Sequence, residues 1–414
     1  MLLEFSVKNY LSFKDKVTLS LLGNEDVMGH EDDNTFYDGG TLILKSVVIY
    51  GTKESGKSNL IKAMQFMRHF VLNSAVGEQS EAEIDVDNFK LAIEMAHQPS
   101  QFEITFVHED RYYRYGFELD SRNICQEWLY QQQKRLFHRK NQSVKFDESF
   151  TEGQLFLGDS EEEYQGLKLV RETALLLSTA ARFDCKISQK LIHWFENQFN
   201  ISLVDGENFL QQLTDAVEHG KIFVIDELDL KLPILVEDLI LNMMNLEYVS
   251  PESANLRGSA QLILNLVGTE GLKLSLSSVI LESILNVFNS QWENPDNAQL
   301  IFSLHDSSLL TSQNFRRDQI WFTEKDRHGA TDLYSALEID DSDEYYEETE
   351  YFEVRDKYNP TMIEVGEVCR KKRKKYFEGR YGSIPFTGDF SIFKDSDDFD
   401  DENQYDENQY DEDE

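Results

Sequence analysis

Residues 41–58 read TLILKSVVIYGTKESGKS. The first ten residues, Thr41–Tyr50, are mostly β-branched and apolar, which predicts one buried strand. The next eight, Gly51–Ser58, fit the pattern G-x-x-x-x-G-K-[ST] in full, and an amphipathic pattern then predicts a helix to about Ser74. A strand, a glycine-rich turn and a helix in this order are typical of a loop that binds phosphate groups.

Each residue type in this loop has a chemical reason. Glycines let the backbone curl so that successive N–H groups face a phosphate, and the positive end of the helix points at the same anion. Lys57 can reach the β- and γ-phosphates, and Ser58 can offer its hydroxyl to Mg²⁺. Glu54 opposes phosphate binding unless its side chain points away. The candidate nucleotide-binding residues are Gly51, Thr52, Lys53, Glu54, Ser55, Gly56, Lys57, Ser58 and Asn59, and the alternative interpretation is an ordinary glycine turn.

Two further strand ends carry candidate catalytic residues. Lys221–Leu228 (KIFVIDEL) reads as a buried strand that ends in two acids. Beside a phosphate loop, Asp226 would hold Mg²⁺ and Glu227 would polarise the attacking water as a general base. His305 follows the apolar strand Gln299–Leu304 and could reach the γ-phosphate. The alternatives are a strand that runs into a solvated acidic turn, and a structural histidine.

Buried strands alternate with helices along the chain, which predicts an α/β fold with a mostly parallel sheet flanked by helices. Phe102–Val107, Tyr112–Leu119 and the region around Trp128 alternate as strands of a β-rich insertion, with a hairpin turn at His108–Arg111. Residues 163–200 read as helical. We expect five regions: the first part of the α/β unit with the phosphate loop (1–85), the β-rich insertion (86–150), a helical subdomain (151–215), the second part of the α/β unit (216–390) and a disordered acidic tail (391–414).

The composition excludes several classes of protein. The 414 residues carry a net charge of −37, and Asp395–Glu414 alone contains twelve carboxylates and no Lys or Arg. This acidity argues against DNA binding by the whole surface, although it leaves a local basic groove open, and Arg370–Lys375 (RKKRKK) is a cationic run. The sequence shows no secretory signal and no apolar stretch of about 18 residues, which predicts a cytoplasmic protein without a membrane span.

The order of these motifs resembles that of the ABC/SMC-like ATPase heads, and within them the bacterial AAA-type ATPases of the OLD and abortive-infection (AbiL/RloA-like) group. The matching stretches cover most of residues 1–390 and are MLLEFSVKNYLSFKD, GTKESGKSNLIKAM, FEITFVHEDRYYRYGFELD with EWLY, KIFVIDELD, QLIFSLHDSSLL with RRDQIWFTEKD, and EGRYGSIPF. The resemblance implies ATP hydrolysis with Mg²⁺ in a homodimer or higher oligomer, which would sandwich ATP between the loop of one subunit and a signature segment of the other. It also implies a sensor of anti-phage defence that acts beside a separate effector protein, a nuclease or a toxin.

Three features depart from this group. Lys53 and Glu54 stand where such loops usually carry Asn and a small residue. The signature segment is degenerate, with Ser202–Glu207 (SLVDGE) as the candidate, and Pro233 stands where a His is usual. Two functions therefore stay open: an Mg²⁺-dependent ATPase that acts as a sensor, and a nucleotide-gated scaffold with little or no hydrolysis that binds and releases an effector.

Overall fold

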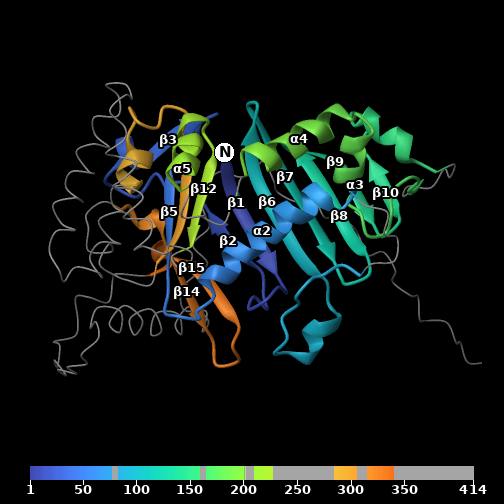
Figure 1. The fold of residues 1–414 in the computed structure, drawn as a ribbon, viewed down its shortest axis with the longest axis horizontal. Helices are drawn as coiled ribbons and strands as arrows, with labels where there is room; N and C mark the ends of the chain where they lie inside the picture. Colours follow the sequence, from blue (N-terminus) through green and yellow to red (C-terminus); the bar gives the residue numbers. More distant parts are fainter. Residues whose placement is uncertain are drawn as a thin grey trace, which may run out of the picture.

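The computed structural model describes residues 1–76, 83–158, 165–199, 201, 209–226, 284–304 and 315–339. These residues form two large β-sheets, a short hairpin and several helices (Figure 1). None of the described helices is long and apolar enough to cross a membrane. The predicted acidic tail and the cationic run Arg370–Lys375 lie outside the described residues.

The larger sheet has eight antiparallel strands in the order β11-β10-β9-β8-β7-β6-β1-β2. They are β1 (Leu2–Lys8), β2 (Val17–Ser20), β6 (Ser100–His108), β7 (Arg111–Leu119), β8 (Ile124–Gln131), β9 (Lys134–Lys140), β10 (Ser143–Phe146) and β11 (Gln165–Gly166). β6 and β7 are joined by Glu109 and Asp110, both left-handed with φ of 50° and 58°, which is the two-residue turn predicted at His108–Arg111. Because β1 pairs with β6, this sheet continues from the N-terminal strands into the predicted β-rich insertion.

The second sheet has five strands in the order β12-β13-β5-β14-β15. They are β5 (Ser46–Tyr50), β12 (Ile222–Asp226), β13 (Gln299–Leu304), β14 (Ile320–Lys325) and β15 (Thr331–Ser335). β12, β13, β5 and β14 are parallel, and β15 pairs antiparallel with β14. The prediction of an α/β fold with a mostly parallel sheet is confirmed for this sheet.

Helices lie beside both large sheets (Figure 1). They are α1 (Glu31–Asn34), α2 (Lys57–Asn73), α3 (Leu176–Arg182), α4 (Lys186–Asn197) and α5 (Phe209–Glu218), with 3-10 turns at Ile93–His97, Thr151–Phe156, Arg317–Gln319 and Ala336–Glu338 and helical residues at 284–289. α2 begins beside β14 and β15 and runs diagonally across the antiparallel sheet (Figure 1).

The period-two alternation of β5 divides the interior into two cores. Val47 and Ile49 pack in the core that β5 shares with α2 and the antiparallel sheet. Val48 and Tyr50 point to the opposite face, where they pack with α5 and the helical residues 284–289. A strand that is buried on both faces must be apolar at successive positions, which explains the continuous run VVIY.

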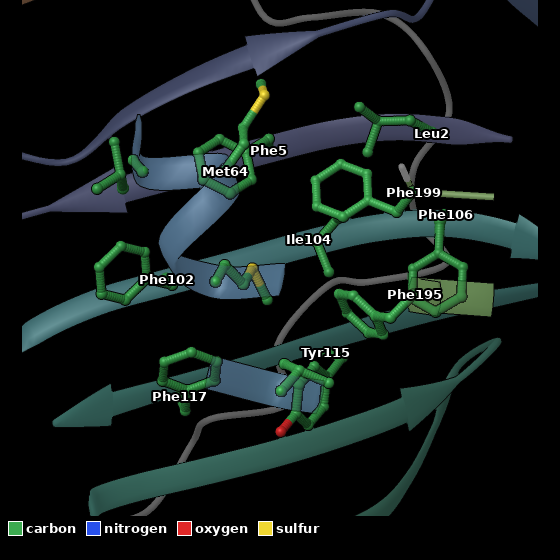
Figure 2. Close-up of a cluster of buried hydrophobic side chains, with 14 of the residues drawn as sticks. Leu2, Phe5, Met64, Phe102, Ile104, Phe106, Tyr115, Phe117, Phe195 and Phe199 are labelled. Carbon is green, nitrogen blue, oxygen red and sulfur yellow. The ribbon is translucent and has the colours of Figure 1, made fainter. Parts of the chain in front are cut away.

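α2 is held by its apolar face. Leu60, Met64 and Met67 are fully buried against the antiparallel sheet, and Figure 2 shows Met64 beside Phe5 and Phe102. Burial of each such side chain contributes about 1.5–3 kcal/mol relative to exposure. This packing fixes the start of α2, and with it the position of the phosphate loop.

The prediction of a single strand at Thr41–Tyr50 is wrong, because the chain changes sheets within it. β4 (Thr41–Leu44) pairs with β3 (Thr35–Asp38) in a separate hairpin, whereas β5 joins the parallel sheet. Lys45 separates the two strands, and its buried ammonium donates a hydrogen bond to the carbonyl oxygen of Asn289 at 3.1 Å. An apolar run has the same pattern whether it serves one sheet or two, so periodicity could not show the change.

The prediction of a helical stretch at 163–200 is only partly right. α3 and α4 lie within it, but residues 165–175 are not helical. The carbonyl oxygens of Arg171 and Ala174 accept hydrogen bonds from the buried guanidinium of Arg139, at 3.2 and 2.6 Å. These carbonyl oxygens therefore bind a side chain of β9 in the antiparallel sheet. The local helical pattern of the sequence could not predict this contact.

Candidate functional site

The phosphate loop connects β5 to α2. Tyr50 ends the strand, residues 51–56 form the loop and Lys57 begins the helix. The loop folds onto itself, because the N–H of Ser55 donates to the carbonyl oxygen of Thr52 at 3.2 Å. The loop leaves the parallel sheet at the carboxyl ends of its strands, the edge at which α/β sheets commonly bind ligands.

The two glycines of the motif stand at positions that have no room for a side chain. Gly56 has φ of +119°, and a Cβ atom there would lie 2.3 Å from Thr331 Oγ1. A Cβ atom at Gly51 would lie 2.4 Å from Thr323 Oγ1 and equally close to Ser55 Oγ. Both positions exclude a side chain, one of them also through its backbone conformation, so the curl of the loop depends on glycine.

Lys57 is folded against its own loop. Its ammonium donates to the carbonyl oxygens of Gly51 at 2.6 Å and Thr52 at 3.0 Å, and the residue is only 8% exposed. Ser58 follows in the first turn of α2 and is half-buried. The cation and the hydroxyl therefore lie next to the backbone that would receive a phosphate.

The start of α2 carries no acidic side chain. Its N-cap residue is Gly56, which has no side chain to cap the helix, and no acidic residue lies in its first turn. A helix carries a partial positive charge at its N-terminus, and this helix has 17 residues. A phosphate placed in the loop would meet that charge without a competing carboxylate in the first turn.

The unusual residues of the loop are turned to solvent. Thr52, Lys53 and Glu54 are exposed, in contrast to the buried Ser55, Gly56 and Lys57. Glu54 adopts a left-handed conformation with φ of 65°. The exposure of Glu54 meets the condition under which a carboxylate is tolerated in such a loop.

Asp226 lies at the same edge of the sheet as the loop. In the strand register, Asp226 is opposite Ser303, and Ser303 is opposite Ile49, one residue before the end of β5. The hydroxyl of Ser303 donates to Asp226 Oδ1 at 2.8 Å, and both residues are buried. The parallel strands thus bring the loop and the aspartate to one edge, with β13 between them.

Ser58 and Asp226 suit Mg²⁺ by their chemistry. Within the part of the chain that the structure describes, no three His, Cys, Asp or Glu side chains gather into a metal cage. At phosphoryl-transfer sites Mg²⁺ uses one or two protein oxygens and completes its coordination with phosphate oxygens and water. One hydroxyl and one carboxylate fit this donor set, and a bound Mg²⁺ would neutralise negative charge on the phosphates.

Four predicted features lie outside the described residues. They are the candidate base Glu227, the candidate histidine His305, the candidate signature segment Ser202–Glu207, and Pro233. The roles assigned to them stay predictions.

Four hydroxyl residues at the site were missed by the sequence analysis: Ser12, Ser303, Thr323 and Thr331. Ser303 and Thr323 lie near the carboxyl ends of apolar strands, as Asp226 does, and that placement was a usable signal. Ser12 accepts a hydrogen bond from the amide of Asn59 at 2.8 Å, but it lies in a turn and its sequence context gave no signal.

The arrangement of the loop, its flanking elements and Asp226 is known from other proteins. A glycine loop between a buried parallel strand and a long helix, at one sheet edge with a buried aspartate, is a P-loop nucleotide-binding fold. Residues 46–173 match the model of a family described as "AAA domain, putative AbiEii toxin, Type IV TA system". The match spans the phosphate loop, α2 and most of the antiparallel strands, which is less than half of the chain. This similarity supports a P-loop ATPase of the AAA or ABC kind.

No curated protein matches the chain. Among solved structures 47 chains match, including the SMC head domain from Thermotoga maritima. That chain is 10% identical, with 81% of this chain and 98% of that chain covered, and the TM-score is 0.30. A TM-score of 0.30 is too low to establish a common fold, so the fold assignment depends on the strand order and direction of this chain.

Proposed function

We propose that this chain binds ATP at residues 51–58 and hydrolyses it with Mg²⁺. One observation carries the proposal: the register of β5, β13 and β12 brings the phosphate loop and Asp226 to the same sheet edge. A phosphate-binding loop and a magnesium-binding carboxylate must act on the same phosphates, so their placement at a single edge is the feature that the chemistry requires.

Each residue has a role in this proposal. The backbone N–H groups of residues 51–56 and the start of α2 bind the phosphates, and Lys57 exchanges its bonds to the loop carbonyls for bonds to phosphate oxygens. Ser58 and Asp226 hold Mg²⁺. Glu227 acts as the general base toward water, and His305 contacts the γ-phosphate.

The biological role in the proposal is that of a sensor or regulator in anti-phage defence. The chain would act in the cytoplasm as a homodimer or higher oligomer, with a separate nuclease or toxin as effector. The description of the matching family, which mentions a toxin and a toxin–antitoxin system, supports this role, as do the motifs shared with the abortive-infection group.

A second function is favoured by the composition of the loop. Lys53 and Glu54 depart from the usual loop sequence, and Ser202–Glu207 is a degenerate signature. A chain of this kind could bind ATP with little or no hydrolysis and act as a nucleotide-gated scaffold for its effector. The release of phosphate, measured with and without a partner, separates this function from an ATPase.

Substitution of Lys57 tests the site itself. We expect Lys57→Ala to weaken ATP binding by at least about 100-fold, because it removes a charge-assisted contact to phosphate. Isothermal titration with Mg-ATP measures the affinity, and Lys62→Ala, which removes an exposed cation of α2, is the matched control. Equal affinity of Lys57→Ala and wild type would refute the site.

Substitution of Glu227 tests hydrolysis separately from binding. We expect Glu227→Gln to keep ATP affinity and to lose phosphate release, because the amide cannot accept a proton from water. An ATP-bound oligomer should then accumulate in size-exclusion chromatography. Undiminished phosphate release from this variant would remove Glu227 from the mechanism.

A further inference from the structure

Two buried threonines of the β14–β15 hairpin lie against the phosphate loop. Thr331 Oγ1 is 2.8 Å from the carbonyl oxygen of Ser55 and 2.8 Å from Ser12 Oγ. Thr323 Oγ1 is 2.7 Å from Ser55 Oγ and 3.3 Å from the carbonyl oxygen of Tyr50. Both threonines are 4% exposed, so water competes little for these contacts.

The hydrogens of this group can be assigned, because each hydroxyl has only one. The carbonyl oxygen of Ser55 can only accept, so the hydrogen of Thr331 belongs to that bond. Ser12 then donates to Thr331, and the side-chain amide of Asn59 donates to Ser12 at 2.8 Å. The result is one continuous chain of donors from α2, through the turn after β1 and through β15, to the carbonyl of Ser55.

The same two threonines explain the glycines of the motif. The Cβ atom that a side chain would add at Gly51 meets Thr323 Oγ1, and the one at Gly56 meets Thr331 Oγ1. Gly51 and Gly56 bound the loop, so the hairpin contacts both of its ends. A contact at both ends, together with a bond to the carbonyl of Ser55, fixes the path of the backbone between them.

We propose that Thr323 and Thr331 are positioning residues for the phosphate loop. They hold its backbone in the binding conformation before a ligand arrives. Binding therefore does not lose free energy to the ordering of the loop. The consequence for ATP rests on the proposed function, whereas the effect on the loop itself does not.

Isosteric substitution separates the effect of the hydroxyl group from the effect of the side-chain volume. Thr331→Val keeps the volume and removes the hydrogen bond, whereas Thr331→Ser keeps the hydroxyl. Thr105→Val is the matched control, because Thr105 is a buried threonine of β6 in the antiparallel sheet. All variants are made in the full chain and are measured without ligand and with Mg-ATP.

Hydrogen exchange of the amides at 51–56 without nucleotide is the first measurement. We expect Thr331→Val to speed this exchange by about tenfold or more, since the carbonyl of Ser55 loses its partner. Thr331→Ser and Thr105→Val should stay within about twofold of wild type. A general loss of protection across both sheets in Thr331→Val, with no excess in the loop, would overturn the proposal.

Affinity for Mg-ATP is the second measurement. We expect Thr331→Val to bind about tenfold more weakly than wild type, and Thr331→Ser to restore the affinity. If Thr331→Val matches Thr105→Val in both loop exchange and ATP affinity, the proposal is wrong. If wild type binds no ATP but Thr331→Val still speeds loop exchange, the positioning role stands and the proposed function fails. Should Thr331→Val not fold, Thr323→Val is judged by the same two criteria.

Discussion

Two helices of this protein begin in opposite ways. α3 begins at the buried Glu127, whose carboxylate oxygens accept hydrogen bonds from the N–H groups of Leu176 at 2.7 Å and Leu177 at 2.9 Å. Tyr115 and Arg139 contact the same carboxylate. α2 begins at the phosphate loop, where the N-cap residue Gly56 offers no side chain and no acid lies in the first turn.

The difference between the two helix starts fits the proposed function. Burial raises the pKa of Glu127, and Arg139, the two amides and Tyr115 oppose part of that rise. At α3 the protein supplies the anion itself, in a closed arrangement that serves the fold. At α2, under the proposed function, the same backbone chemistry would bind the phosphates of ATP.

The largest effect is expected from breaking the closed arrangement. Glu127→Ala should lower the free energy of unfolding by about 3–5 kcal/mol, because it leaves the fully buried Arg139 without its carboxylate. Urea unfolding measures the change. Lys16→Ala, which removes the exposed partner of Glu103 on the same sheet, should cost less than about 1 kcal/mol. Similar losses of unfolding free energy in the two variants would show that Glu127 contributes no more to stability than an exposed ion pair does.

The next effect concerns the edge shared by the loop and Asp226. Asp226→Asn should lower Mg²⁺-dependent phosphate release by about 100-fold, because an amide is a much poorer ligand for Mg²⁺ than a carboxylate. Ser303 can still donate to the remaining oxygen, so the fold should be kept. Steady-state phosphate release at several Mg²⁺ concentrations measures the change, and Asp215→Asn on α5 is the control. An unchanged Mg²⁺ dependence would show that Asp226 does not bind the metal.

The smallest effect is expected at Glu54, the exposed acid of the loop. Glu54→Gln should tighten ATP binding by about threefold at low salt, since it removes a negative charge near the phosphates, and the gain should vanish near 1 M salt. Lys53→Gln should change the affinity in the opposite direction. Titrations at two salt concentrations test both, and a gain that persists at high salt would point to a cause other than charge.

Glu54→Gly adds a backbone effect to the loss of charge. Relief of the left-handed conformation favours the variant by about 1–2 kcal/mol, and the greater freedom of glycine in the unfolded chain offsets about 0.5–1 kcal/mol of that. The net gain in stability should therefore be about 0.5 kcal/mol. A loss of stability relative to Glu54→Gln would show that the side chain of Glu54 supports the loop.

The local features of this protein could be predicted from residues that are close together in the chain. The motif at 51–58, the buried strand before it, the helix after it and the turn at Glu109–Asp110 all depend on residues close together in the chain. Backbone conformation and hydrophobic periodicity depend on a few neighbouring residues, so these features can be predicted from the sequence alone. The acidic end of β12 was legible for the same reason.

The contacts between distant residues became known only from the folded structure. It placed β13 between β5 and β12, brought Thr323 and Thr331 against the loop, and set Glu127 at the start of α3. The change of sheet at Lys45 belongs with these. Such contacts join residues tens to hundreds of positions apart, and a single serine or threonine in a strand has no pattern that names its partner. The sequence could therefore identify the loop that we propose binds phosphates, but not the hydroxyl groups that lie against it.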